Sequence, residues 1–196
     1  QTWAMIFSKS STRTRVSFEV GVYELGGRAL FLNTDDIQLG RGELVKDTAR
    51  VLGRMTHGCI IRTYAQQDVE DFAYYSQIPT VNALTDQEHP CQILTDLFTI
   101  QERFGTVHGK VIAFVGDGAS NISNSWAFAA GKMDFELRVA ASEEFQLSDE
   151  VVEKAKGKIL RTTDPLEAVE GADVLYTDTW VSMGKEEEEA RRLSLL

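Results

Sequence analysis

The feature that most constrains the fold is a repeated alternation of short apolar segments with helical patterns. Apolar runs such as AMIF (4–7), GCIIRTY (58–64) and GKVIAFVGDG (109–118) are typical of buried strands, and amphipathic segments separate them. Strands joined through helices pair in parallel, because a parallel crossover needs a connection long enough to hold a helix. The sequence therefore predicts an α/β architecture with parallel sheets.

The predicted elements form two series. The first has strands at 4–7, 28–33, 58–64 and 78–84 and helices at 14–25, 44–55, 67–76 and 90–104. The second has strands at 109–118, 135–141, 158–163 and 173–180 and helices at 148–156 and 164–172. Gly105 ends the helix at 90–104, so we place a domain boundary near 104–108 and expect domains at 1–104 and 105–196.

Composition narrows the class of protein. The chain has 196 residues, enough for one or two domains, and a net charge of −10, which argues against a nucleic-acid surface. It shows neither an apolar run of membrane-spanning length nor a signal-peptide pattern. Cys59 and Cys91 are too few for a disulfide scaffold, which favours a reducing compartment. The first residue is Gln1, so we expect the natural N-terminus to lie upstream.

The segment SSTRTRVSFE (10–19) begins a predicted helix with two cations. Arg13 and Arg15 stand where the helix dipole disfavours positive charge. Backbone N–H groups, a guanidinium and nearby hydroxyls can together hold a phosphate; the hydroxyl residues are Ser11, Thr12 and Thr14. A basic loop that merely precedes a helix is the alternative, and these residues alone do not decide between the two.

Other polar groups also follow predicted strands. Ligands of open parallel sheets bind beyond the carboxyl ends of the strands, so such groups are candidates for one site. They are Arg62, His89, Gln92, the segment 116–121 and the segment 178–184. A histidine that caps a carbonyl and an aspartate that caps a turn are the structural alternatives for His89 and Asp178.

The turn FVGDGASN (114–121) suggests a dinucleotide site, but the match is poor. Gly116 and Gly118 fit a G-x-G-x-x-G pattern, whereas Asn121 occupies the third glycine position. A polar side chain there favours ligand contact over close helix packing.

Three motifs resemble the aspartate/ornithine carbamoyltransferase family, in the same order and over nearly the whole chain. They are STRTRVSFE (11–19), EHPCQILTDLFTI (88–100) and DTWVSMG (178–184). The third is similar to the ornithine-side loop of that family, so the resemblance is strongest to its ornithine-specific members.

The resemblance implies a fold of two parallel-sheet α/β/α domains, with the ligand site in the cleft between them. Domain 1–104 would bind carbamoyl phosphate, and domain 105–196, Rossmann-like, would bind ornithine. It further implies transfer of the carbamoyl group to the side-chain amine of ornithine, giving citrulline in arginine metabolism, with no metal or organic cofactor. A homotrimer, or a multiple of it, in the cytoplasm or the mitochondrial matrix is also implied.

The resemblance also assigns residues. It implies phosphate contacts from Ser11, Thr12, Arg13 and Thr14, carbamoyl contacts from Arg62, His89 and Gln92, and Gln38 reaching into a neighbouring subunit's site. Ornithine contacts would come from Asn121, Asp178, Ser182 and Met183. The chemistry agrees, because amine attack builds negative charge on the carbonyl oxygen and Arg13, Arg62 and His89 can donate to it. We take these three as the catalytic candidates.

Two departures from the family pattern are visible. The chain stops at Leu196, ahead of the family's later His-Cys-Leu-Pro segment and a further arginine contact, and the region 143–163 is short. We therefore expect both domains to be incomplete here. Two other functions remain open: a carbamoyltransferase for another amine (putrescine, aspartate or an acylated ornithine), and a non-catalytic Rossmann-type nucleotide-binding module.

Overall fold

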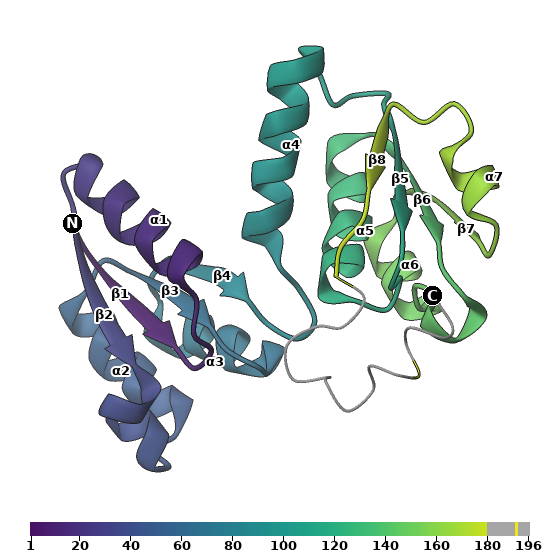
Figure 1. The fold of residues 1–196 in the computed structure, drawn as a ribbon. Coiled ribbons are helices and arrows are strands. Elements are labelled where there is room, and N and C mark those ends of the chain that lie inside the picture. The colour runs from purple at the N-terminus through teal and green to yellow at the C-terminus, as the bar shows by residue number, and fades with distance from the viewer. Residues whose placement is uncertain (180–190, 192–196) are drawn as a thin grey trace. The chain divides into compact units, whose positions relative to one another are not determined.

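A computed structural model describes residues 1–179 and 191, and it divides the chain into two compact units. Unit 1 is Gln1–Cys91 and unit 2 is Gln92–Leu196. Each unit contains one parallel four-stranded sheet with helices on both faces (Figure 1). The predicted class, two parallel-sheet α/β domains, is confirmed.

Unit 1 has the strand order β2-β1-β3-β4. Its strands are β1 (Thr2–Phe7), β2 (Arg28–Asn33), β3 (Gly58–Arg62) and β4 (Thr80–Leu84). Its helices are α1 (Thr12–Glu24), α2 (Val45–Met55) and α3 (Gln66–Ser76), and the loop after β2 forms two 3-10 turns, η1 (Thr34–Asp36) and η2 (Gln38–Arg41).

The two faces of the unit 1 sheet are covered unequally. Helices α2 and α3 bury one face, where Ala49 and Phe72 pack with strand residues such as Ile61. Helix α1 covers the other face with partly buried Phe18 and Val22, and none of its residues is fully buried. The apolar side chains of Val16, Val20 and Tyr23 on α1 are exposed.

Unit 2 has the strand order β7-β6-β5-β8. Its strands are β5 (Val111–Val115), β6 (Glu136–Ala140), β7 (Lys158–Thr162) and β8 (Val174–Tyr176). Its helices are α5 (Asn121–Met133), α6 (Asp149–Ala155) and α7 (Pro165–Val169), with a 3-10 turn, η3 (Glu143–Phe145), after β6. Helix α4 (Pro90–Phe104) begins at the unit division.

Helix α4 has the predicted bounds but a different packing partner from the one expected. Its apolar residues Ile93, Leu97 and Ile100 belong to the core that also contains Phe114 and Trp126. The compact units divide before this helix, between Cys91 and Gln92.

Helix α5 is absent from the predicted elements. Its sequence NISNSWAFAAGKM is rich in serine and asparagine, which compete for backbone hydrogen bonds and obscure the helical pattern. Ser120 nevertheless caps it, accepting from the Ser123 N–H at 3.1 Å, and Trp126 is completely buried.

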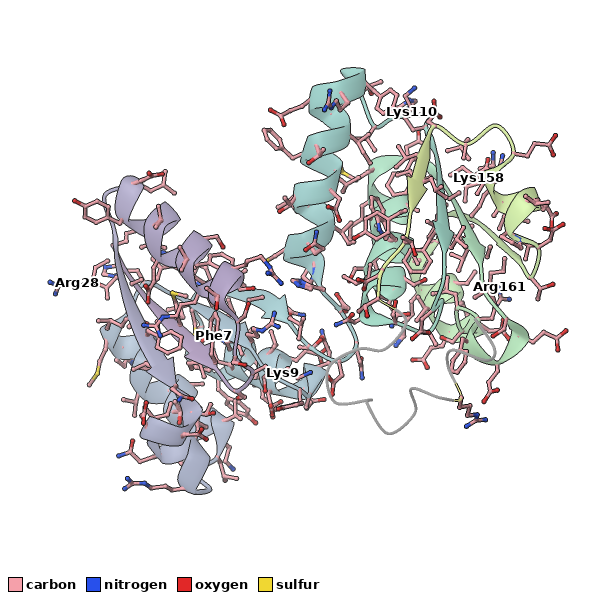
Figure 2. The ribbon with its side chains drawn as sticks, in the orientation of Figure 1. Phe7, Lys9, Arg28, Lys110, Lys158 and Arg161 are labelled. Atoms are coloured by element: carbon pink, nitrogen blue, oxygen red, sulfur yellow. The ribbon has the colours of Figure 1, made fainter. Side chains whose placement is uncertain are left out.

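Strand register aligns the carboxyl ends of the unit 1 strands. Phe7 pairs with Asn33 on one side and with Arg62 on the other, and Arg62 pairs with Leu84 across a register shift. Figure 2 labels Phe7 at the end of β1 and Lys9 in the loop that follows. Side chains that come directly after these strands therefore share one edge of the sheet.

We predict opposite effects for two glycine-to-alanine changes within unit 1 helices. An added Cβ at Gly53 in α2 would collide with the Ser76 carbonyl of α3, so Gly53→Ala should destabilise by about 1–3 kcal/mol. Gly21 in α1 has nothing within 4 Å of an added Cβ, so Gly21→Ala should stabilise by about 0.5–1 kcal/mol. Urea unfolding measures both, and equal effects would contradict the packing described.

Candidate active site

The first turn of α1 holds the predicted phosphate motif and contains no acidic residue. Ser11 caps the helix: its Oγ accepts from the Thr14 backbone N–H at 3.2 Å and donates to Thr14 Oγ1 at 3.0 Å. The backbone N–H groups of Thr12 and Arg13 lie in the first turn, which offers no carbonyl four residues earlier within the helix. This end of α1 therefore presents donors suited to an anion.

The two arginines of the motif differ in their surroundings. Arg15 donates from Nε to Glu19 Oε1 at 3.1 Å, and its guanidinium lies 3.6 Å from the ring centroid of Phe31. Arg15 is therefore held in an ion pair within α1. Arg13 is exposed, and within residues 1–179 no carboxylate lies at ion-pair distance from it.

Arg62 is a buried cation at the end of β3. It is only 4% exposed, and its Nε has no hydrogen-bond partner in the part of the chain that the structure describes. Burial lowers the pKa of Arg62, and the positive charge of Arg13 lowers it further. Arg13 and Arg62 therefore lie close enough to repel each other.

His89 lies next to this pair, in the loop between β4 and α4. Burial lowers the pKa of His89 to about 4, with the charge of Arg62 as the second cause. The imidazole is thus neutral at pH 7, and a neutral ring still carries one N–H donor. The structure brings together all three catalytic candidates, Arg13, Arg62 and His89.

The loop that carries His89 is tied to its surroundings. Thr85 donates its backbone N–H to the Glu88 carbonyl at 2.8 Å, and Glu88 returns its N–H to Thr85 Oγ1 at 3.0 Å. Lys9 forms an ion pair with Asp86. These contacts join the loop after β4 to the loop after β1, and so fix His89 relative to the start of α1.

Two other predicted ligand residues, Gln38 and Gln92, have different surroundings. Gln38 is exposed at the start of η2, and no described side chain of the Arg13, Arg62 and His89 group hydrogen-bonds to it. Gln92 belongs to unit 2, where its amide Nε2 donates to both carboxylate oxygens of Asp96, at 3.0 and 3.2 Å.

Unit 2 gathers carboxylates at the carboxyl edge of its sheet. Asp178 follows β8, and burial raises its pKa, with the charge of Asp117 as a further cause. Asp117 itself is 2% exposed in the turn after β5, and Asn121 opens α5 close by in sequence. Ser182 and Met183, the other predicted ornithine contacts, lie outside the described residues.

Asp96 and Tyr176 were not among the predicted site residues, whereas Asp117 lies in the predicted segment 116–121. A signal was available for Asp96, because it stands four residues after Gln92 on a predicted helix, a spacing that brings side chains together. The glycine turn gives no support to a dinucleotide site. An added Cβ at Gly118 would come within 2.8 Å of the Phe145 carbonyl oxygen, so this glycine serves packing inside unit 2.

Comparison with known proteins assigns both halves of the chain. Residues 1–102 match the carbamoyl-P binding domain of aspartate/ornithine carbamoyltransferase, and residues 108–196 match the Asp/Orn binding domain. The chain belongs to the aspartate/ornithine carbamoyltransferase family. The predicted resemblance is confirmed.

Relatives within this carbamoyltransferase family cover nearly the whole chain. An ornithine carbamoyltransferase of Akkermansia muciniphila is 61% identical over 96% of this chain and 63% of its own length. One from Methanoculleus marisnigri is 53% identical over 98% of this chain and 63% of its own length. The chain thus spans somewhat less than two thirds of the curated relatives it matches.

Solved structures of the carbamoyltransferase family share the fold. The anabolic ornithine carbamoyltransferase of Campylobacter jejuni is 44% identical with a TM-score of 0.92, covering 100% of this chain and 67% of that one. The enzyme from Pyrococcus furiosus is 44% identical with a TM-score of 0.90, covering 100% and 64%.

We predict that Arg13 and Arg15 affect different properties. Arg13→Ala should weaken inorganic phosphate binding by about 10–100-fold, as expected for a charge-assisted donor, while stability stays unchanged or rises by about 0.3–1 kcal/mol. Arg15→Ala should lower stability by about 0.5–1 kcal/mol and leave phosphate binding intact, because it removes an ion pair and a cation–π contact. Calorimetric titration and urea unfolding test this. Equal, small effects of the two substitutions on phosphate binding would mean that the motif is only a basic turn.

We predict that His89 titrates far below an ordinary histidine. Its ring resonances should shift with a midpoint near pH 4, about the value that burial and Arg62 impose, and added phosphate should raise that midpoint. The unfolded chain binds this proton at about pH 6.5, and the folded chain binds it only near pH 4. The free energy of unfolding should therefore be highest above pH 6.5 and should decrease as the pH drops from 6.5 to 4. A His89→Gln variant should lose that part of the pH dependence. A midpoint above about pH 6 in the ligand-free protein would contradict the burial of His89 and its repulsion by Arg62.

Proposed function

We propose that this protein transfers the carbamoyl group of carbamoyl phosphate to the side-chain amine of L-ornithine, giving L-citrulline and phosphate. Family membership supports this, as do relatives named ornithine carbamoyltransferase at 50–61% identity. The observation that carries it is the buried guanidinium of Arg62. It faces Arg13 and His89 and, among the described residues, has no carboxylate partner.

The cationic group in unit 1 suits the donor substrate. Carbamoyl phosphate carries a phosphate dianion, and a dianion offsets the repulsion between Arg13 and Arg62. The open N–H groups of α1 and the hydroxyls of Thr12 and Thr14 add neutral donors. We assign phosphate binding to Ser11, Thr12, Arg13 and Thr14.

The same group suits the chemical step. The amine nitrogen of ornithine attacks the carbonyl carbon, the carbon–oxygen bond to phosphate breaks, and the electron pair leaves with the phosphate. The attacking nitrogen loses a proton as citrulline forms. Negative charge builds on the carbonyl oxygen during the attack, and we assign its stabilisation to Arg62, His89 and Arg13. His89 acts as a neutral donor, since its pKa of about 4 leaves it unprotonated.

Unit 2 suits the acceptor. Half-buried Asp178, near Asp117, favours a cation in its neighbourhood, and the α-ammonium of ornithine is one. An aspartate side chain would instead meet a like charge. We assign ornithine binding to Asn121 and Asp178, and on resemblance alone to Ser182 and Met183.

We also propose an oligomeric state and a cellular compartment for the protein. We expect a homotrimer, or a multiple of it, in which Gln38 reaches a neighbour's site; Gln38 is exposed while adjacent Leu39 packs into the unit 1 core. A reducing compartment, cytoplasm or mitochondrial matrix, fits two cysteines that form no disulfide with each other. No helix in the described part of the chain is both long and apolar enough to span a bilayer.

We predict that the purified protein uses ornithine and rejects aspartate and putrescine as acceptors. Asp178→Asn should raise KM for ornithine by roughly 10–100-fold, since it removes a charge-assisted contact, and leave KM for carbamoyl phosphate nearly unchanged. Citrulline formation measured with each amine provides the test.

Comparable turnover of aspartate and ornithine would overturn the acceptor assignment. Thermal stabilisation by NAD or ATP, without stabilisation by carbamoyl phosphate, would overturn the enzyme class in favour of a nucleotide-binding module.

A further inference from the structure

The side-chain amide of Gln66 lies at the centre of a hydrogen-bond network in unit 1. Gln66 is the first residue of α3 and is half-buried. Its Oε1 accepts from Thr85 Oγ1 at 2.8 Å and from Asn82 Nδ2 at 3.3 Å. Its Nε2 donates to the carboxylates of Glu88 and Glu70, each at 3.4 Å. An amide has two donor hydrogens and two acceptor lone pairs, so these contacts use its full capacity.

Two of these contacts hold Glu88, the residue directly before His89. The Glu88 N–H donates to Thr85 Oγ1 at 3.0 Å, and the Thr85 hydroxyl donates to Gln66 Oε1. The Glu88 carbonyl is a more distant acceptor for that hydroxyl, at 3.4 Å. A hydroxyl proton directed at Gln66 leaves the lone pairs of Oγ1 for the Glu88 N–H. Since Gln66 Nε2 also donates to the Glu88 carboxylate, Gln66 holds both the backbone and the side chain of Glu88.

The other side of the loop is held separately. The Asp86 N–H donates to the Tyr64 carbonyl at 2.8 Å, and the Asp86 carboxylate pairs with Lys9. Asp86 precedes His89 by three residues, whereas Glu88 is its immediate neighbour. The Gln66 contacts therefore act closer to the histidine than the Lys9 contact does.

The chemistry of this network favours an amide at position 66. Burial raises the pKa of Glu88, and the charge of Glu70 raises it further. A hydrogen bond from a neutral N–H favours the ionised carboxylate, so Gln66 opposes that rise. A glutamate at this position would bring a third carboxylate to the same point. An apolar residue would leave the buried Thr85 hydroxyl without its closest acceptor.

We propose that Gln66 is a positioning residue for His89: through Thr85 and Glu88 it fixes the loop that places the imidazole beside Arg62. This rests on the proposed function, in which His89 donates to the carbonyl oxygen of carbamoyl phosphate. A donor stabilises developing charge when it is held in place before the reaction begins. Loosening the loop should therefore slow the chemical step more than it weakens substrate binding.

Gln66→Met tests this role, because methionine keeps an unbranched side chain of similar length and loses the amide. The His89 ring should gain water and move away from Arg62, so its NMR titration midpoint should rise by about one pH unit, from about 4 toward 6.5. Losing the Gln66 donor also makes Glu88 harder to ionise, which alone would lower the His89 midpoint. A rise therefore reports displacement of the ring.

The same variant should show a split between kcat and KM. We expect kcat for citrulline formation to fall about tenfold, less than the roughly 10²–10³ expected when a donor is lost outright. KM for carbamoyl phosphate should change less than about twofold. Thr85→Val should shift both kcat and the His89 midpoint in the same directions, and Thr85→Ser, which keeps the hydroxyl, should preserve them.

Gln67→Met is the matched control. Gln67 is the next residue of α3, is exposed, and donates to Asp71 at 2.8 Å. This substitution should leave the His89 midpoint and kcat unchanged. Urea unfolding of all variants separates the two roles, because a merely structural role for Gln66 would lower the free energy of unfolding without moving the midpoint.

An unchanged His89 midpoint in Gln66→Met, or a raised midpoint with an unchanged kcat, would overturn the positioning role and leave the proposed function standing. If Gln66→Met fails to fold, Thr85→Val compared with Thr85→Ser decides by the same two measurements. An unsubstituted protein that forms no citrulline would overturn the proposed function, while the His89 midpoint would still decide whether Gln66 holds the loop.

Discussion

The unit 1 site depends on one unfavourable placement, the buried guanidinium of Arg62. Removing a cation from water is costly unless an anion or several acceptors compensate it. Here the neighbouring groups are Arg13 and His89, and both interact unfavourably with its charge when protonated. The site is therefore built for an anion supplied from outside. A short dianion that reaches all three groups satisfies this requirement better than a side-chain carboxylate, which brings one charge.

Strand register rather than helix packing holds this group together. Arg62 pairs with Phe7 and Leu84, so its position is fixed by two parallel neighbours. Helix α1, which supplies Arg13, contributes no fully buried residue, and its first turn lacks the acidic residues that would stabilise it. Helix α1 can begin there despite the unfavourable charge of Arg13, because the sheet and the Lys9–Asp86 ion pair position the loops that follow β1 and β4.

The sequence predicted local features well and non-local ones poorly. Pro90 and Gly105 bracket α4, so its bounds follow from backbone chemistry alone, whereas the core it joins depends on residues far along the chain. Helix α5 was missed because serine and asparagine hide its apolar stripe. The convergence of Arg62 and His89 follows from parallel topology, since both come after strands of one sheet. The hydrogen bond from Tyr176 to Asp96 could not be predicted, because it requires β8 to lie beside β5.

The two units carry opposite local charges, and these charges act on different parts of the chemistry. Unit 1 concentrates cations in a chain whose net charge is −10, and unit 2 concentrates carboxylates. Asp178 raises the pKa of Asp96, and Asp117 raises that of Asp178, so the carboxylates disfavour one another's ionised form. A cation bound beside Asp178 opposes this repulsion. Amine binding beside Asp178 therefore also favours the ionised form of Asp96.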